Sequence, residues 1–131
     1  MVEWDVIHRY TRAQALADGM LVDVSEVASE AGFCVPVAVT QAVWHLIVPN
    51  PAEQAACQDL QGRLWDTLYM AFLAIRRRGG ASSSEQLLYR VIFQLRGRDG
   101  RNGQHTVTLK ILSGPGDEAE HVITIMFPEE D

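Results

Sequence analysis

The sequence predicts an α+β fold in which N-terminal helices, including one long helix, pack on a C-terminal three-stranded antiparallel β-meander. Over residues 51–78, apolar side chains recur every three or four positions, the period of a helix with one buried face. From residue 87 onward, apolar and polar side chains alternate, the period of a strand in a half-buried sheet. The period changes at the glycine- and serine-rich residues 79–84, which therefore mark the boundary between helices and sheet.

A short helix is predicted near the N-terminus, over residues 12–17. Thr11 and Gln14 have the spacing of a capping box, in which each side chain bonds the backbone of the other residue. Gly19 is expected to end this helix, because glycine adopts the left-handed conformation without a Cβ clash. Residues 21–24 are predicted to be briefly extended.

Two further short helices are expected before the long one. Ser25 is predicted to be the N-cap of a helix that Gly32 ends, since a serine oxygen can accept from an otherwise unpaired amide. Residues 33–36 should then be extended. Thr40 is predicted to cap the next helix, which Pro49 closes.

The long helix is predicted over residues 51–78. Asn50 as N-cap, Pro51 at the first helical position and Glu53 three residues after the cap all favour a start at this point. At 1.5 Å per residue such a helix would be roughly 40 Å long. We expect its apolar stripe to be the spine of the fold; the stripe consists of Cys57, Leu60, Leu64, Leu68, Phe72 and Ile75.

The three strands of the meander are predicted around residues 87–95, 106–111 and 123–127, with glycine-rich turns at 97–103 and 113–120. Odd-numbered residues form the apolar face, and we expect the long helix to cover it. The even-numbered face is mixed and is predicted to bind a partner or to receive the N-terminal helices; it comprises Arg90, Ile92, Gln94, Arg96, Thr106, Thr108, Lys110, Val122, Thr124 and Met126.

Composition places the chain among single-domain globular proteins, with one domain over residues 1–131. Hydrophobic residues make up 47% and charged residues 21%, and the formal charge of −6 opposes non-specific attraction to phosphate backbones. The N-terminus has neither a signal-peptide pattern nor an apolar stretch long enough to span a membrane, so a cytoplasmic protein without a membrane partner is expected. Cys34 and Cys57 lie on apolar segments and are interpreted as buried thiols.

No catalytic, metal-binding or cofactor-binding motif is present. The four histidines are far apart in sequence, neither cysteine lies beside a base, and the serine cluster at 82–84 falls in a glycine-rich link. The glycines at 97–103 precede a strand, whereas a phosphate-binding loop precedes a helix. We therefore predict a protein that is not an enzyme and has no cofactor, although an active site can be assembled from residues scattered in sequence.

Two interaction surfaces are predicted. On the even-numbered sheet face, Ile92 and Met126 favour a protein partner or a homodimer. The run of three arginines that ends the long helix is explained by the helix dipole alone, or it joins two arginines of the hairpin loop in a patch for phosphate or an acidic partner. That patch comprises Arg76, Arg77, Arg78, Arg98 and Arg101. Nucleic-acid binding through it is the alternative function, less favoured because the chain is acidic.

The segments YTRAQALADGMLVDVSEVASEAGFCVPVAVTQAVW and SGPGDEAEHVITIMFPEED resemble an uncharacterised bacterial family of small proteins with a domain of unknown function. Members of that family are often encoded on plasmids and integrative conjugative elements. The resemblance implies an accessory protein of mobile DNA, with a role in plasmid maintenance or in countering host defence. It implies no catalytic residues.

Overall fold

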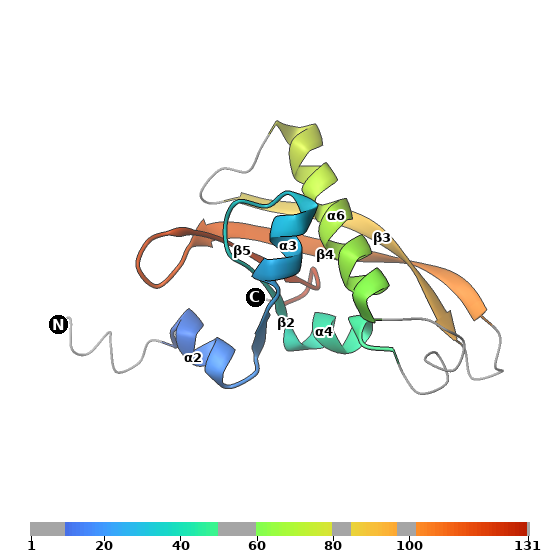
Figure 1. Ribbon diagram of the computed structural model, residues 1–131, viewed down its shortest axis with the longest axis horizontal. Helices are drawn as coiled ribbons and strands as arrows, with labels where there is room; N and C mark the ends of the chain where they lie inside the picture. Colours follow the sequence, from blue (N-terminus) through green and yellow to red (C-terminus); the bar gives the residue numbers. More distant parts are fainter. Residues whose placement is uncertain (1–9, 50–59, 80–84, 97–101, 131) are drawn as a thin grey trace.

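The computed structural model describes residues 10–49, 60–79, 85–96 and 102–130, which form an α+β fold around one five-stranded sheet (Figure 1). The strands lie in the order β1-β2-β5-β4-β3. The strands are β1 (Leu21–Asp23), β2 (Val37–Thr40), β3 (Glu85–Arg96), β4 (Asn102–Pro115) and β5 (His121–Met126). The helices are α2 (Arg12–Ala17), α3 (Ser25–Ala31), α4 (Gln41–Ile47) and α6 (Leu60–Arg78).

The predicted three-stranded meander is wrong as a description of the sheet. Strands β3, β4 and β5 are consecutive antiparallel neighbours, but β2 pairs parallel with β5, and β1 pairs antiparallel with β2. The sheet is therefore mixed, and the long helix lies in the middle of the chain, between β2 and β3. The sequence of β2, VAVT, is apolar without alternation because this short strand is buried, so it shows no period-2 pattern.

Most local signals for the short helices are confirmed. The capping box of Thr11 and Gln14 begins α2, and Thr40 accepts from the amide of Val43 at the start of α4. Ser25 is the first helical residue of α3 rather than its cap; its hydroxyl accepts from the amide of Val37 at 3.0 Å and so ties α3 to β2. Helix α6 ends at Arg78 as predicted, while the predicted start at residues 51–59 lies outside the described residues.

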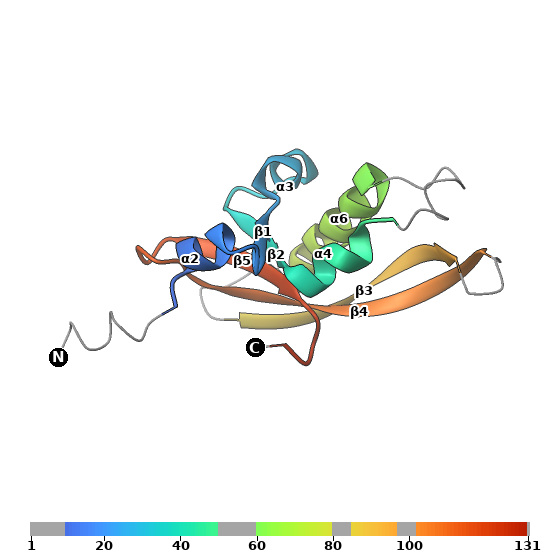
Figure 2. The same ribbon diagram turned by 90° about the horizontal axis from the view of Figure 1, so that it is seen from below.

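The core lies between the sheet and the helices α3, α4 and α6, which Figure 2 shows together on one side of the sheet. The odd-numbered side chains of the three C-terminal strands form the buried face, where α6 packs on β3 and α4 on β5, and the Tyr89 hydroxyl donates to the carbonyl of Thr67 at 3.0 Å. Burial raises the pKa of Tyr89. The buried strand residues on this face are Tyr89, Val91, Phe93, Leu109, Ile111, Ile123 and Ile125.

Helices α3 and α6 approach closely at Gly32, the residue that follows α3. Its φ of +121° lies in the region that favours glycine, and a Cβ at this position would lie 2.7 Å from the Phe72 ring. The Phe72 ring also contacts Phe33 edge-on, with centroids 5.7 Å apart. Glycine at this position therefore serves both the helix end and the packing of two helices.

Candidate functional site

The even-numbered sheet face is exposed on β3 from Leu88 to Ile92 and on β4 at Thr106 and Thr108. Leu88 and Ile92 are 59% and 58% exposed, which is unusual for large aliphatic side chains in a sheet. In the register, Arg90 lies opposite Thr108 and Ile92 lies opposite Thr106. We call Leu88, Arg90, Ile92, Thr106 and Thr108, all of them exposed, the open face.

The other part of the even-numbered face is covered. The alternation of side chains places Met126 on the same face as Ile92, but Met126 is only 3% exposed, and Val122 and Thr124 are buried as well. Because a buried side chain cannot meet a partner on the surface, the structure separates Met126 from the open face and leaves Ile92 on it.

The C-terminal tail provides part of this cover. Lys110 is buried, and its Nζ donates to the carbonyls of Pro128 and Glu130, at 3.3 and 2.7 Å. The Glu130 carboxylate accepts from the Thr40 hydroxyl and from the amide of Phe127, each at 2.8 Å. These bonds hold the tail against the sheet, so the Glu130 side chain stabilises the fold.

Strand β3 has one free edge. Within the described part of the chain, β4 pairs with one side of β3 and no strand pairs with the other. Gly116 donates to the carbonyl of Glu120, so even-numbered β4 residues point their backbone groups toward β5 and odd-numbered ones toward β3. By the register of β3 on β4, the even-numbered residues of β3 then point their N–H and C=O groups outward.

A groove of about 540 Å³ runs between this free edge and α6. It is lined from α6 by Met70, Ala74, Arg77 and Arg78, and from β3 by residues of both faces, Leu87, Leu88, Tyr89 and Arg90. Arg78 donates to the carbonyl of Gln86 at 3.4 Å, which agrees with the outward direction of even-numbered backbone groups. The groove is therefore both apolar and cationic, and it gives access to the β3 backbone.

The predicted arginine patch is divided. Arg77 and Arg78 line the groove, whereas the Arg76 guanidinium lies over the Phe72 ring, 5.7 Å from its centroid. Arg98 and Arg101 lie outside the described residues. Arg90 joins Arg77 and Arg78 instead. No sequence signal could show that Arg90 lies beside the helix end, since this depends on which strand forms the edge.

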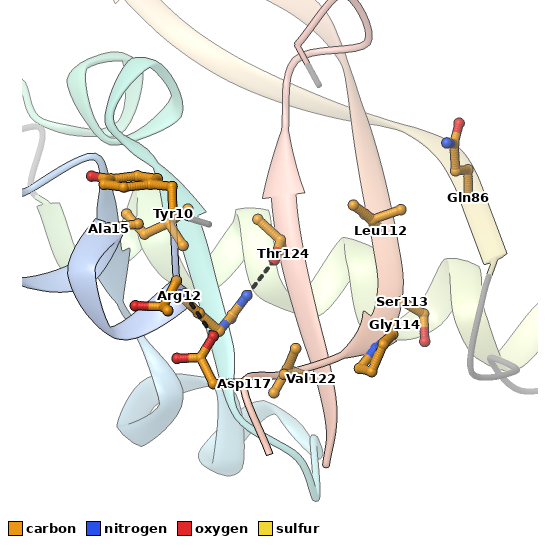
Figure 3. A pocket seen from close by; sticks show the side chains of 14 residues that line it. Tyr10, Arg12, Ala15, Gln86, Leu112, Ser113, Gly114, Asp117, Val122 and Thr124 are labelled. Carbon is orange, nitrogen blue, oxygen red and sulfur yellow. Dashed lines mark hydrogen bonds between the residues drawn. The ribbon is translucent and has the colours of Figure 1, made fainter. Parts of the chain in front are cut away.

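A second hollow, of about 520 Å³, lies between α2 and the β4–β5 turn (Figure 3). The Asp117 carboxylate accepts from the amides of Arg12 and Ala13, at 2.8 and 2.9 Å, and the Arg12 guanidinium donates to the Thr124 hydroxyl and the Ile123 carbonyl. Burial lowers the pKa of Arg12, and the Asp117 charge opposes that shift. These contacts attach α2 to the sheet, so the polar groups of the hollow already have protein partners.

One serine–histidine pair was missed from the sequence because it forms across a hairpin. The Ser113 hydroxyl lies 2.5 Å from Nε2 of His121. Although this geometry resembles a nucleophile and its base, Ser113 is only 2% exposed and lies on the core side of the sheet. The pair is best explained as a satisfied buried hydroxyl.

Other chemistry-bearing residues are dispersed. Cys34 is exposed, which corrects the prediction of a buried thiol: it lies in the link between α3 and β2, and its neighbour Phe33 is the residue that turns into the core. Cys57 lies outside the described residues. In the part of the chain that the structure describes, no three histidine, cysteine or carboxylate side chains could share a metal ion, and no helix is both long and apolar enough to cross a membrane.

The sequence model of a family of unknown function, DUF6573, matches residues 2–131. No curated protein and no solved structure matches the chain. Since the family match spans nearly the whole sequence, the chain belongs to DUF6573.

Proposed function

We propose that this DUF6573 member is a non-enzymatic binding protein that meets a protein partner through the open face and the adjoining edge of β3. The observation that carries the proposal is the exposure of Leu88 and Ile92 in the middle of a regular strand. A monomeric protein normally turns such side chains into the core, and exposed apolar groups beside polar ones are typical of interaction surfaces.

A pull-down from the native host tests this function when it compares matched baits. The wild-type bait should retain a protein that Ile92→Arg loses, because a charge replaces an aliphatic contact on the open face. Met20→Arg is the control, since Met20 is also exposed, at 52%, but directly precedes β1, at the opposite edge of the sheet from β3. If both variants retain the same proteins as wild type, the open face does not bind them and the proposal fails.

The partner could also be a second copy of the chain. Light scattering after size exclusion, measured over a range of concentrations, distinguishes this case. A homodimer through the open face should dissociate in Ile92→Arg and persist in Met20→Arg. A monomer at every concentration eliminates the homodimer version and leaves the heterologous partner.

Nucleic-acid binding is the second candidate, and the gathering of Arg77, Arg78 and Arg90 beside one groove favours it. Arginines bind phosphates through counterion release, so the affinity should fall steeply with salt concentration. Replacing Arg77 and Arg78 with glutamine should reduce the slope of log affinity against log salt by about one unit per lost phosphate contact. The absence of binding to DNA or RNA at low salt would eliminate this candidate.

We further infer that the protein acts in the bacterial cytoplasm as an accessory protein of mobile DNA. Support comes from the resemblance of its N- and C-terminal segments to proteins encoded on plasmids and conjugative elements, and from its acidic composition. Deleting its gene from a plasmid that carries it should change plasmid maintenance or conjugative transfer, and complementation with Ile92→Arg should fail to restore it. Unchanged maintenance and transfer would contradict this role.

A further inference from the structure

We propose that β3 accepts an extended, acidic peptide segment of the partner as an added strand, which would extend the five-stranded sheet at its free edge. This inference rests on the proposed binding function and deepens it. It specifies the mode of recognition, which is backbone pairing along an edge, and the chemistry of the segment, which carries carboxylate and aliphatic side chains.

The free edge of β3 has the backbone groups that strand addition needs. The backbone N–H and C=O groups point outward at Leu88, Arg90 and Ile92, as does the Gln86 carbonyl, which accepts from Arg78. Such groups form the same ladder with an incoming strand that odd-numbered residues form with β4. Several hydrogen bonds are thus available in the middle of β3.

This edge lacks most of the features that prevent pairing. Natural edge strands are commonly short, bulged, interrupted by proline or charged, and of these β3 has only charge, at residues such as Arg90. β3 has 12 residues, contains no proline, and pairs with β4 in one unbroken register. The opposite edge of the sheet, β1, is only 3 residues long. Of the two edges of the sheet in the described residues, only that of β3 is therefore long enough to hold a peptide.

The lining of the groove identifies the segment. An added strand would place alternate side chains toward α6, where they meet Met70, Ala74 and Arg77, and the others toward the open face, beside Arg90 and Ile92. Both sides offer an apolar patch next to a guanidinium. Aliphatic and acidic side chains therefore complement the groove, and an acidic segment also avoids like-charge contacts.

The same charges disfavour a second copy of the chain. Antiparallel pairing of two β3 strands would bring the arginine-lined grooves of both copies together, and pairing centred on Arg90 would set two arginines directly opposite one another. A nucleic acid could use the arginines, but it would leave the outward backbone groups and the aliphatic side chains of Leu88 and Ile92 without partners. A peptide strand contacts the arginines, the outward backbone groups and the aliphatic side chains together.

The decisive variant is Leu88→Pro, with Leu88→Thr as its matched control. The amide of Leu88 points outward, so proline removes a donor from the free edge without removing a bond to β4. Threonine removes the same aliphatic side chain and keeps the donor. The probe is a fluorescent, end-blocked peptide of about ten residues that alternates valine and glutamate, long enough to cover most of β3.

Wild type should bind this peptide, and Leu88→Pro should weaken binding by about tenfold or more, whereas Leu88→Thr should weaken it less. Arg90→Glu should weaken binding and reduce its dependence on salt. A peptide with lysine in place of glutamate, or with N-methyl groups on its central amides, should not bind. Circular dichroism confirms that each variant is folded, and Ile92→Pro, at the next-but-one outward amide, replaces Leu88→Pro if that variant does not fold.

Other outcomes overturn the inference in different ways. Equal losses in Leu88→Pro and Leu88→Thr would mean that the open face, not the edge, binds the peptide, so the strand addition fails while the proposed function stands. No binding of the peptide at any concentration would also refute it, and the Ile92→Arg pull-down would then decide the proposed function separately. Self-association that Leu88→Pro abolishes would identify a second copy as the occupant. Binding of single-stranded DNA that Arg90→Glu abolishes and Leu88→Pro preserves would identify a nucleic acid.

Discussion

Replacing Gly32 with alanine tests how closely α3 and α6 pack. The backbone at Gly32 has φ +121°, and an added Cβ would lie 2.7 Å from Cζ of Phe72. The half-buried Phe72 ring packs edge-on against Phe33 and beneath the Arg76 guanidinium, so it must shift against these neighbours to make room. The substitution therefore imposes both backbone strain and overpacking, and the two costs add.

Each cost has a typical size. A non-glycine residue in the left-handed region costs roughly 1–2 kcal/mol, and overpacking a well-filled core costs about 1–3 kcal/mol. We expect Gly32→Ala to lower the free energy of unfolding by about 3 kcal/mol. For a chain of 131 residues, this corresponds to a fall in Tm of roughly 10 °C.

Gly19→Ala is the matched control. Gly19 ends α2 with the same pattern of backbone hydrogen bonds and has φ +79°, but a Cβ there would have no atom within 4 Å. This variant should therefore lose only the strain component, about 1–2 kcal/mol. Urea denaturation of both variants, and of Gly32→Ala combined with Phe72→Leu, measures the difference and the coupling to the ring. Equal losses at the two glycines, or no coupling to Phe72, would refute the packing argument.

Three further predictions concern single contacts. Burial raises the pKa of Tyr89 above its unfolded value of about 10, so its contribution to the free energy of unfolding is complete below that pH and falls at higher pH, by about 1.4 kcal/mol per pH unit. Urea denaturation at about pH 8 and pH 11 should show that Tyr89→Phe loses less stability between the two pH values than wild type, and an equal loss would contradict this. Lys110→Met should release the C-terminal tail, so that a glutamate-specific protease cleaves at Glu130 faster than in wild type; equal cleavage rates would show that other contacts hold the tail. Asp117→Ala removes the acceptor of the Arg12 amide and should cost about 1 kcal/mol, with faster hydrogen exchange at that amide, whereas unchanged exchange would show that the cap is dispensable.

The parts of the fold that the sequence predicted correctly depend on near neighbours. The capping box at Thr11, the helix end at Gly32 and the alternation through β3 each involve residues within a few positions of one another. The position of β2 beside β5 depends on pairs such as Val37 with Ile123, which are far apart in the sequence. A four-residue apolar strand with a parallel neighbour has no local signal, so the mixed sheet could not be predicted from pattern.

The candidate site divides in the same way. Alternation correctly placed Ile92 and Met126 on the even-numbered face. An even or odd position in a strand shows only which face of the sheet a side chain is on, and not what covers that face. Lys110 and the C-terminal tail cover the part near Met126, and their bonds connect residues about 20 positions apart. The free edge was also beyond sequence reasoning, because it depends on the complete strand order.

The lengths of the strands explain why the surface is open where it is. β5 pairs with β4 only over residues 110–115, so residues 102–109 of β4 pair with β3 alone. A two-stranded ribbon is marginally stable unless another layer packs on it, and α6 supplies that layer on the odd-numbered face only. Among the residues that the structure describes, no second layer packs on the even-numbered face at Ile92, or at Leu88, which pairs with Lys110 next to the ribbon. The ribbon is thus stabilised from one side, and its other face and its free edge are the places where a partner gains most by completing the sheet.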